Sequence, residues 1–141
     1  MKKNLSGGAV LIFIILISGA CTKNTDPDGD QTIANISGIY QLTGFTKTIR
    51  DITYNSFDTM SVCRKDNLVR FNADMTVNFI DAGTPCSFAT NTTGNWRLAN
   101  GYLYMNKDTL RIINFNGKIL ALTAISSRDP GVVNFITWMK K

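Results

Sequence analysis

Apolar and polar residues alternate with a period of two along much of the chain from residue 36 onward. Such alternation is typical of β-strands that bury one face, whereas the buried face of a helix repeats every 3.6 residues. It predicts strands over residues 39–46, 67–71, 75–81, 93–98, 101–106, 109–115, 118–126 and 132–139. In the third of these strands, Met75, Val77 and Phe79 share one face. Residues 47–62 show no clear period, and 49–54 could be extended or partly helical.

Short turn sequences separate the predicted strands. Asn116-Gly117 lies between two apolar strands and is the strongest hairpin signal, because both residues tolerate the positive φ of a type I′ turn. Residues 72–74, 99–100 and 128–131 are also short and carry turn-forming side chains. About eight antiparallel strands joined in this way predict an all-β fold, either an up-and-down barrel or a sandwich.

The first 21 residues have a different pattern. Lys2 and Lys3 precede an unbroken apolar run over residues 9–17, and small residues then lead to Cys21. An apolar core this short behind a basic start predicts a secretory signal peptide over residues 1–20 rather than a membrane span. The cysteine at the cleavage point resembles that of bacterial lipoprotein signals, in which it is acylated and becomes the N-terminus. Ser18 stands where Leu, Val or Ile is usual, which leaves an ordinary signal peptide or a retained helix as alternatives.

The lipidated Cys21 and the polar residues that follow it, up to residue 35, are predicted to form a flexible tether. Two or three acyl chains on Cys21 would anchor the protein stably in a membrane. Asp26, Asp28 and Asp30 alternate as at the start of a calcium-binding loop, but the sixth and twelfth positions lack the required Gly and Glu. We therefore predict no metal site here. Acidic residues soon after the cysteine also resemble a surface-export signal of Bacteroidetes lipoproteins.

Charge and composition exclude several classes of function. The chain has 15 Lys and Arg residues, 10 acidic residues and a net charge of +5. Without Lys2 and Lys3, 13 basic residues face 10 acidic ones, a net charge of +3. The basic residues are scattered, so no nucleic-acid surface is predicted. The chain has no His and no Glu, which excludes His-based catalysis and His-ligated zinc and favours strands and tight turns over helices.

The three cysteines need separate explanations. With Cys21 lipidated, Cys63 and Cys86 remain as an even pair in an exported, oxidising compartment, which favours a structural disulfide. The alternative is a reactive or metal-binding pair, but the chain offers no further soft ligand that could complete a metal site.

Several motifs resemble those of a known family. Residues 63–67 (CRKDN) and 71–76 (FNADMT) are similar to the C-x-K-D-[DN] and F-x-x-D-G-[ST] motifs of the small lipocalin-like lipoproteins of Bacteroidetes. The match continues through Cys86 and residues 93–98 (TGNWRL), which correspond to the family's [TS]-G-x-W-x-L.

Residues 36–42 (ISGIYQL) also resemble this family, at its opening G-x-W. Tyr40 replaces the usual Trp there, and Met75 replaces the usual turn Gly in the second motif. The resemblance spans residues 36–141 and implies one small lipocalin-like β-barrel of about eight strands in a lipoprotein of the cell envelope.

Aromatic residues of the predicted barrel are the candidates for lining a ligand cavity: Phe71, Phe79, Trp96, Tyr102 and Tyr104. A tryptophan such as Trp96 more often fills a core than binds a ligand. Tyr102 and Tyr104 alternate with apolar neighbours, so either the tyrosines or those neighbours must face outward or line a cavity.

Two threonines are candidate modification sites. Thr59 and Thr109 each follow an Asp and precede an apolar residue, which is similar to the O-glycosylation acceptor D-[ST]-[apolar] of exported Bacteroidetes proteins.

The sequence predicts a protein that is not an enzyme and needs no cofactor, because an enzyme here would require paired Asp carboxylates and no two aspartates have a telling spacing. The leading hypothesis is a lipid-anchored, lipocalin-like barrel of the cell envelope, on the periplasmic face or the surface of the outer membrane. Its interior could hold a small apolar ligand. The alternative is an accessory module with a fully packed barrel that binds an outer-membrane protein complex.

Overall fold

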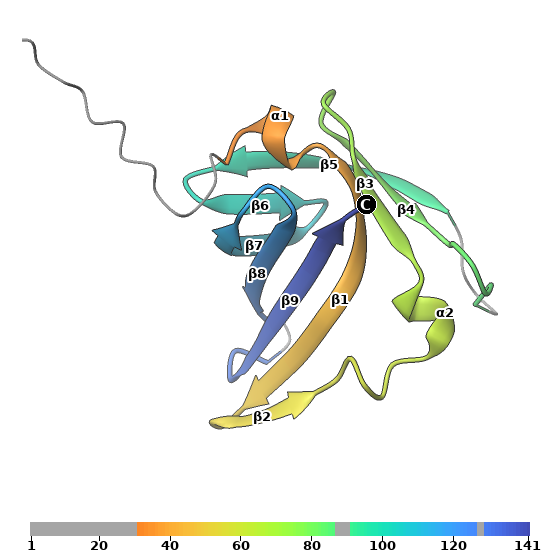
Figure 1. Cartoon of the computed structure of the whole chain (residues 1–141). Helices are drawn as coiled ribbons and strands as arrows, with labels where there is room; N and C mark the ends of the chain where they lie inside the picture. The colour runs from red at the N-terminus through yellow and green to blue at the C-terminus, as the bar shows by residue number, and fades with distance from the viewer. Residues whose placement is uncertain (1–30, 87–90, 127–128) are drawn as a thin grey trace, which may run out of the picture.

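The computed structural model describes residues 31–86, 91–126 and 129–141, and it shows an almost entirely β structure over these ranges (Figure 1). Two helices of a single turn are present: α1 (Ile33–Ile36) and α2 (Val62–Lys65). The strands are β1 (Gly38–Ile49), β2 (Ile52–Asn55), β3 (Leu68–Phe71), β4 (Thr76–Ile80), β5 (Thr92–Ala99), β6 (Tyr102–Met105), β7 (Asp108–Phe115), β8 (Ile119–Ile125) and β9 (Val132–Lys140).

Strand pairing closes the sheet into a barrel. Each strand from β3 to β9 pairs antiparallel with the next, and β9 pairs with β1 from Tyr40–Lys140 to Ile49–Val132. The other edge of β1 pairs with β3 near its start and with β2 near its end. The barrel therefore has eight strands, β1 and β3–β9, and β2 is an extra strand that widens one rim. This confirms the prediction of an all-β, up-and-down antiparallel barrel.

The hairpin turns follow the local sequence, although not always in the predicted form. Asn100 (φ 52°) and Gly101 (φ 76°) both have positive φ, as a type I′ turn requires. In the β7–β8 hairpin the Asn116 N–H donates a hydrogen bond to the Ile119 carbonyl (3.2 Å), so the two central turn residues are Gly117 and Lys118 and not Asn116 and Gly117 as expected. Of the two, only Gly117 (φ 85°) has positive φ, which is the pattern of a type II′ turn and not of the expected type I′ turn. The Asn116 side chain accepts hydrogen bonds from the backbone N–H groups of Lys118 (3.1 Å) and Ile119 (2.7 Å), which stabilises this turn.

Met75 lies in the β3–β4 turn and not in the strand whose face the alternation predicted it to share with Val77 and Phe79. Its backbone is left-handed (φ 65°) and its side chain is 47% exposed. The turn is held by the Asp74 carboxylate, which accepts hydrogen bonds from the Thr76 N–H (3.0 Å) and hydroxyl (2.6 Å). These bonds lower the pKa of Asp74. Only Val77 and Phe79 then continue the inward face of β4.

The first part of the segment without a clear sequence period forms a further hairpin, between β1 and β2. β1 continues three residues beyond its predicted end, to Ile49, and Arg50 (φ 46°) and Asp51 (φ 66°) turn the chain into β2. A hydrogen bond between the hydroxyls of Thr48 and Thr53 (2.9 Å) links the two strands on their outer face. The hairpin projects at the end of the barrel opposite α1 (Figure 1).

Aromatic side chains fill the end of the barrel that α1 closes. The ring of Phe71 lies 5.7 Å from that of Tyr40, 5.0 Å from that of Trp96 and 5.7 Å from that of Trp138, measured between centroids. The Tyr40 hydroxyl donates a hydrogen bond to the Ile36 carbonyl (2.8 Å), and burial raises the pKa of Tyr40 to about 12. We call this packed group the aromatic plug.

Helix α1 is part of this closed end. Ile36 is fully buried in the core, and Ile33 packs against it. The Lys140 ammonium donates a hydrogen bond to the Asn35 carbonyl (2.8 Å). Carbonyl groups at the C-terminal end of a helix have no partner within the helix, so this position favours a cation. The last residues of the predicted tether therefore belong to the barrel cap.

Candidate functional site at the open end of the barrel

The end of the barrel opposite α1 is hollow. This hollow has a volume of about 500 Å³ and is lined by Phe45, Lys107, Asp108, Thr109, Leu110, Ala124, Ile125, Ser126, Asn134 and Ile136. Leu110 is buried at its floor, and Phe45, Ala124 and Ile136 are half-buried around it. Asp108 and Asn134 bring polar groups to the rim. The hollow thus combines an apolar floor with a polar edge, as small-molecule sites usually do.

Strand register determines which side chains face the hollow. Residues directly opposite each other on paired strands point to the same face of the sheet. Ile136 lies opposite Leu122, which is fully buried, and opposite Phe45 on the other side. A bulge between Leu42 and Gly44 shifts the register of β1, so that Leu42 and Phe45 both face inward although three positions apart.

Inward-facing polar residues mark the rim. Asp108 lies opposite the buried Met105, and Asn134 lies opposite Ala124 and Lys47. Asp108 and Asn134 are at positions whose side chains point into the barrel, yet both side chains are polar. They can be polar because they lie at strand ends, where water enters. The hollow-lining residues were missed from the sequence; polar residues at inward phase near strand ends are the signal that could have revealed them.

Two of the predicted ligand-lining residues belong to the aromatic plug and not to the hollow. Phe71 is 1% exposed and Trp96 is 2% exposed. The Trp96 indole N–H donates a hydrogen bond to the Asn72 carbonyl (2.9 Å), so its one polar group is satisfied by the β3–β4 turn. Both side chains close the barrel. Phe79 is half-buried and borders a separate, smaller hollow of about 260 Å³ beside Thr92.

Tyr102 and Tyr104 lie on the outer face of the barrel, so they do not line its interior. The alternating residues Leu103 and Met105 are buried instead. The reason is the register of the β5–β6 hairpin, in which the inward-facing Trp96 lies opposite Met105. The guanidinium of Arg97 stacks on the Tyr104 ring at 3.6 Å from its centroid.

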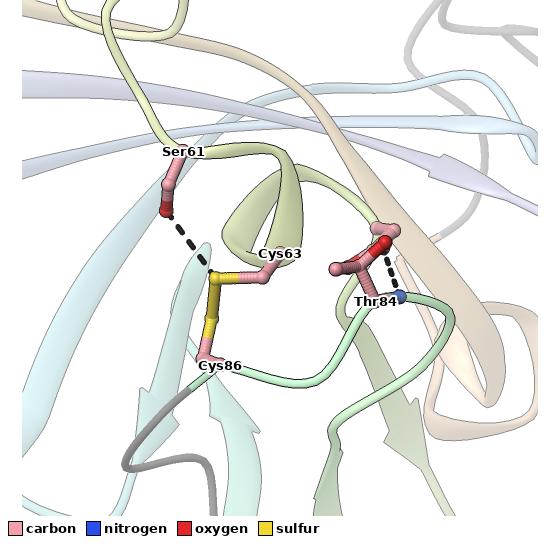
Figure 2. The surroundings of a disulfide bond; sticks show 5 residues. Ser61, Cys63, Thr84 and Cys86 are labelled. Atoms are coloured by element: carbon pink, nitrogen blue, oxygen red, sulfur yellow. Dashed lines mark hydrogen bonds between the residues drawn. A yellow bond between two sulfur atoms is a disulfide. The ribbon is translucent and has the colours of Figure 1, made fainter.

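A disulfide between Cys63 and Cys86 confirms the predicted pairing (Figure 2). The two Cα atoms are 5.2 Å apart, and the bond joins α2 to the segment that follows β4. The Ser61 hydroxyl lies 3.4 Å from the Cys63 sulfur. The bridge therefore holds the connection between β2 and β3 against the connection between β4 and β5.

Hydrogen bonds reinforce the same junction. The Asp66 carboxylate accepts a hydrogen bond from the Thr84 N–H (2.8 Å), and its second oxygen is buried without a hydrogen-bond partner among the described residues. The Asn67 side-chain amide is placed with its NH2 group towards two acceptors, and it donates hydrogen bonds to the Asp81 carboxylate (3.0 Å) and the Cys63 carbonyl (2.9 Å). The residues after Cys63 are thus a structural clamp on residues 81–86.

The remaining candidate sites are at the surface or outside the described residues. Thr59 is exposed in the turn after β2, where its hydroxyl donates to the Ser56 carbonyl (3.2 Å). Thr109 is exposed at the rim of the hollow. Cys21 and the predicted signal peptide lie outside the described residues. Within the described ranges, no cluster of three or more potential metal ligands occurs, and no helix has the length and hydropathy needed to cross a membrane.

Comparison with known proteins gives a likeness of fold. No family model matches the chain, and no curated protein matches it. Among solved structures, bovine odorant binding protein in complex with undecanal is similar, with 12% identity, a TM-score of 0.47 and coverage of 81% of this chain and 76% of that chain. The complex of the same protein with a selenium-containing odorant has a TM-score of 0.47 and 12% identity over 81% of this chain and 75% of that chain. A deswapped triple mutant of it has a TM-score of 0.45 and 12% identity over 76% of this chain and 74% of that chain. The closed barrel itself rests on the strand pairing given above.

Proposed function

We propose that this protein is a non-enzymatic, lipid-anchored protein of the cell envelope whose barrel binds a small apolar ligand at its open end. The observation that carries the proposal is the contrast between the two ends of the barrel. The buried aromatic plug packs into one end, whereas the other end keeps a hollow of about 500 Å³ over an apolar floor. A volume of this size is typical of sites for small molecules, which span roughly 300–1,000 Å³.

The chemistry of the lining supports a ligand with an apolar body and a polar end. Leu110, Ile136 and Phe45 offer apolar surface at depth, where burial of a ligand's hydrocarbon contributes about 25 cal/mol per Å². Asp108 and Asn134 offer hydrogen-bonding groups where the ligand would meet water. A purely hydrocarbon ligand leaves these groups to solvent, and a fully polar one gains nothing from the floor.

The predicted anchor determines which end of the barrel is attached. The described chain begins at residue 31, beside α1 at the closed end. A lipid on Cys21 would therefore hold the barrel by this end, on the periplasmic face or the surface of the outer membrane. The hollow would then lie at the end of the barrel farther from the point of attachment, open to ligands that arrive through the aqueous phase.

Binding of an uncharged fluorescent probe, N-phenyl-1-naphthylamine, tests the site. Ala124→Phe places a large side chain into the hollow, because Ala124 faces inward opposite Asn134. Ala121→Phe is the matched control, since Ala121 lies on the outer face of the same strand, opposite Thr137. We expect saturable binding of one probe by the wild type and by Ala121→Phe, and at least about tenfold weaker binding by Ala124→Phe. Equal binding by the two variants, with both folded by circular dichroism, would contradict the proposed site.

A further inference from the structure

The outer face of β5–β7 carries a compact group of cationic and aromatic side chains. Arg97 on β5 lies opposite Tyr104 on β6, and Tyr102 lies opposite Arg111 on β7. The two tyrosine rings are 6.3 Å apart between centroids. Both arginines are exposed, and Tyr102 is 37% exposed. We call these four residues the Arg–Tyr face.

The stacking of Arg97 prepares it for an anion. Its guanidinium lies 3.6 Å from the Tyr104 centroid, so the flat face of the group is occupied and its side-chain motion is restricted. The N–H groups at the edge of a guanidinium stay free in such a stack, and they match the two oxygens of a carboxylate.

No carboxylate of the described residues pairs with the guanidinium groups of the Arg–Tyr face. Arg97 and Arg111 form no ion pair with a described residue. The aspartate of β7, Asp108, faces the barrel interior opposite Met105. The Arg–Tyr face is thus a positively charged surface whose natural counterpart carries negative charge.

The chain itself supplies such a counterpart. Residues 22–30, just before the first described residue, contain Asp26, Asp28 and Asp30 against a single cation, Lys23. Their net charge is −2, and their composition includes Pro and Gly but no long apolar side chain.

The acidic segment can reach the Arg–Tyr face. Nine residues span at most about 30 Å when extended. The segment joins the barrel at its closed end, where the β5–β6 turn at Asn100–Gly101 also lies, because strands alternate in direction from α1 onward. Tyr102 directly follows this turn, and Arg111 on β7 lies opposite Tyr102. Arg97 is two residues before Ala99, about 7 Å along β5.

We propose that Asp26, Asp28 and Asp30 dock on the Arg–Tyr face of the same chain, with a carboxylate paired to the guanidinium of Arg97. The contact is intramolecular, so even weak ion pairs act at a high effective concentration. It holds the β5–β7 side of the barrel towards the start of the chain and so limits how the barrel turns on its tether. The contact does not depend on the ligand proposed for the hollow.

Nuclear magnetic resonance of arginine side chains tests the contact in the full chain, solubilised in dodecyl maltoside micelles. The Nε–Hε signals of Arg97 and Arg111 are compared between the wild type and the triple variant Asp26→Asn, Asp28→Asn, Asp30→Asn. We expect the two signals to differ between these proteins at about 0.05 M salt and to coincide at about 0.5 M, where screening weakens exposed ion pairs. Arg70, exposed on the outer face of β3, is the internal control and should not change.

Three results would overturn the proposal: identical Arg97 and Arg111 signals in both proteins at low salt, an equal change at Arg70, or a difference that grows with protein concentration. The last would mean that the acidic segment binds a second copy. Cleavage by an endoprotease that cuts before Asp gives an independent readout of the tether. We expect Arg97→Gln with Arg111→Gln to speed cleavage in residues 22–30 about threefold or more, and Arg70→Gln to leave it unchanged.

Discussion

Removal of the Cys63–Cys86 disulfide should destabilise the barrel strongly without changing its fold. The bridge spans 23 residues of sequence. In the loop-entropy model, closing a loop of this length restricts the unfolded chain by about 3 kcal/mol at 25 °C. For a domain of about 110 residues this corresponds to a fall in melting temperature of roughly 10–14 °C. The contacts of Asp66 with Thr84 and of Asn67 with Asp81 remain in the variant, so the native junction should persist.

The variant Cys63→Ala with Cys86→Ala can be compared with the wild type by urea unfolding followed by circular dichroism. We expect an unchanged native spectrum, a lower midpoint and a slightly steeper dependence on urea, because the unfolded chain without the bridge exposes more surface. A stability loss below about 1 kcal/mol would refute the reasoning, since it would mean that the bridge does not restrict the unfolded chain as the loop length requires.

Three other substitutions test particular residues of the barrel. The pKa of the Tyr40 hydroxyl is raised from 10.0 to about 12, so the unfolded chain loses the hydroxyl proton at lower pH than the folded chain does. The free energy of unfolding should therefore fall by about 2–3 kcal/mol as pH rises from about 10 to 12. Urea titrations at each pH should show that Tyr40→Phe lacks this contribution to the fall. Gly94→Ala should cost about 1–2 kcal/mol, because a Cβ at residue 94 would clash with the Asn106 side chain, and Asn106→Gly should rescue most of the loss in a double-mutant cycle. Met75→Gly should stabilise by about 0.5–1 kcal/mol by relieving the left-handed backbone, whereas Met75→Ala should not; equal effects of the two would contradict this explanation.

The eight barrel strands could be predicted because their signals are local. Alternation and turn residues are properties of short segments, and they gave strands that agree with β1 and β3–β9 to within a few residues. The hairpin of β1 and β2 was missed because Arg50-Asp51 takes positive φ without the Gly or Asn that usually marks such a turn. Closure through β1 and β9 joins the two ends of the domain, and single strands carry no signal for such long-range register.

The candidate site was harder to predict because alternation does not say which of the two alternating sets of side chains faces the barrel interior. In β6 both phases are large, Tyr102 and Tyr104 on one side and Leu103 and Met105 on the other. The register with Trp96 decides between them, and this register depends on the turn that precedes β6. The hollow has a further cause that no single strand shows: aromatic rings gather at one end of the barrel, and smaller side chains such as Ala124 are left at the other.

Native mass spectrometry of the protein purified from the membranes of its own host tests the central claim most directly. We predict that the wild type and Ala121→Phe carry the same small apolar molecule in one copy per chain, and that Ala124→Phe is recovered folded but empty. A wild-type barrel that is consistently empty, or that holds a stoichiometric protein partner in place of a small molecule, would contradict the claim that the open end of this barrel is a ligand site.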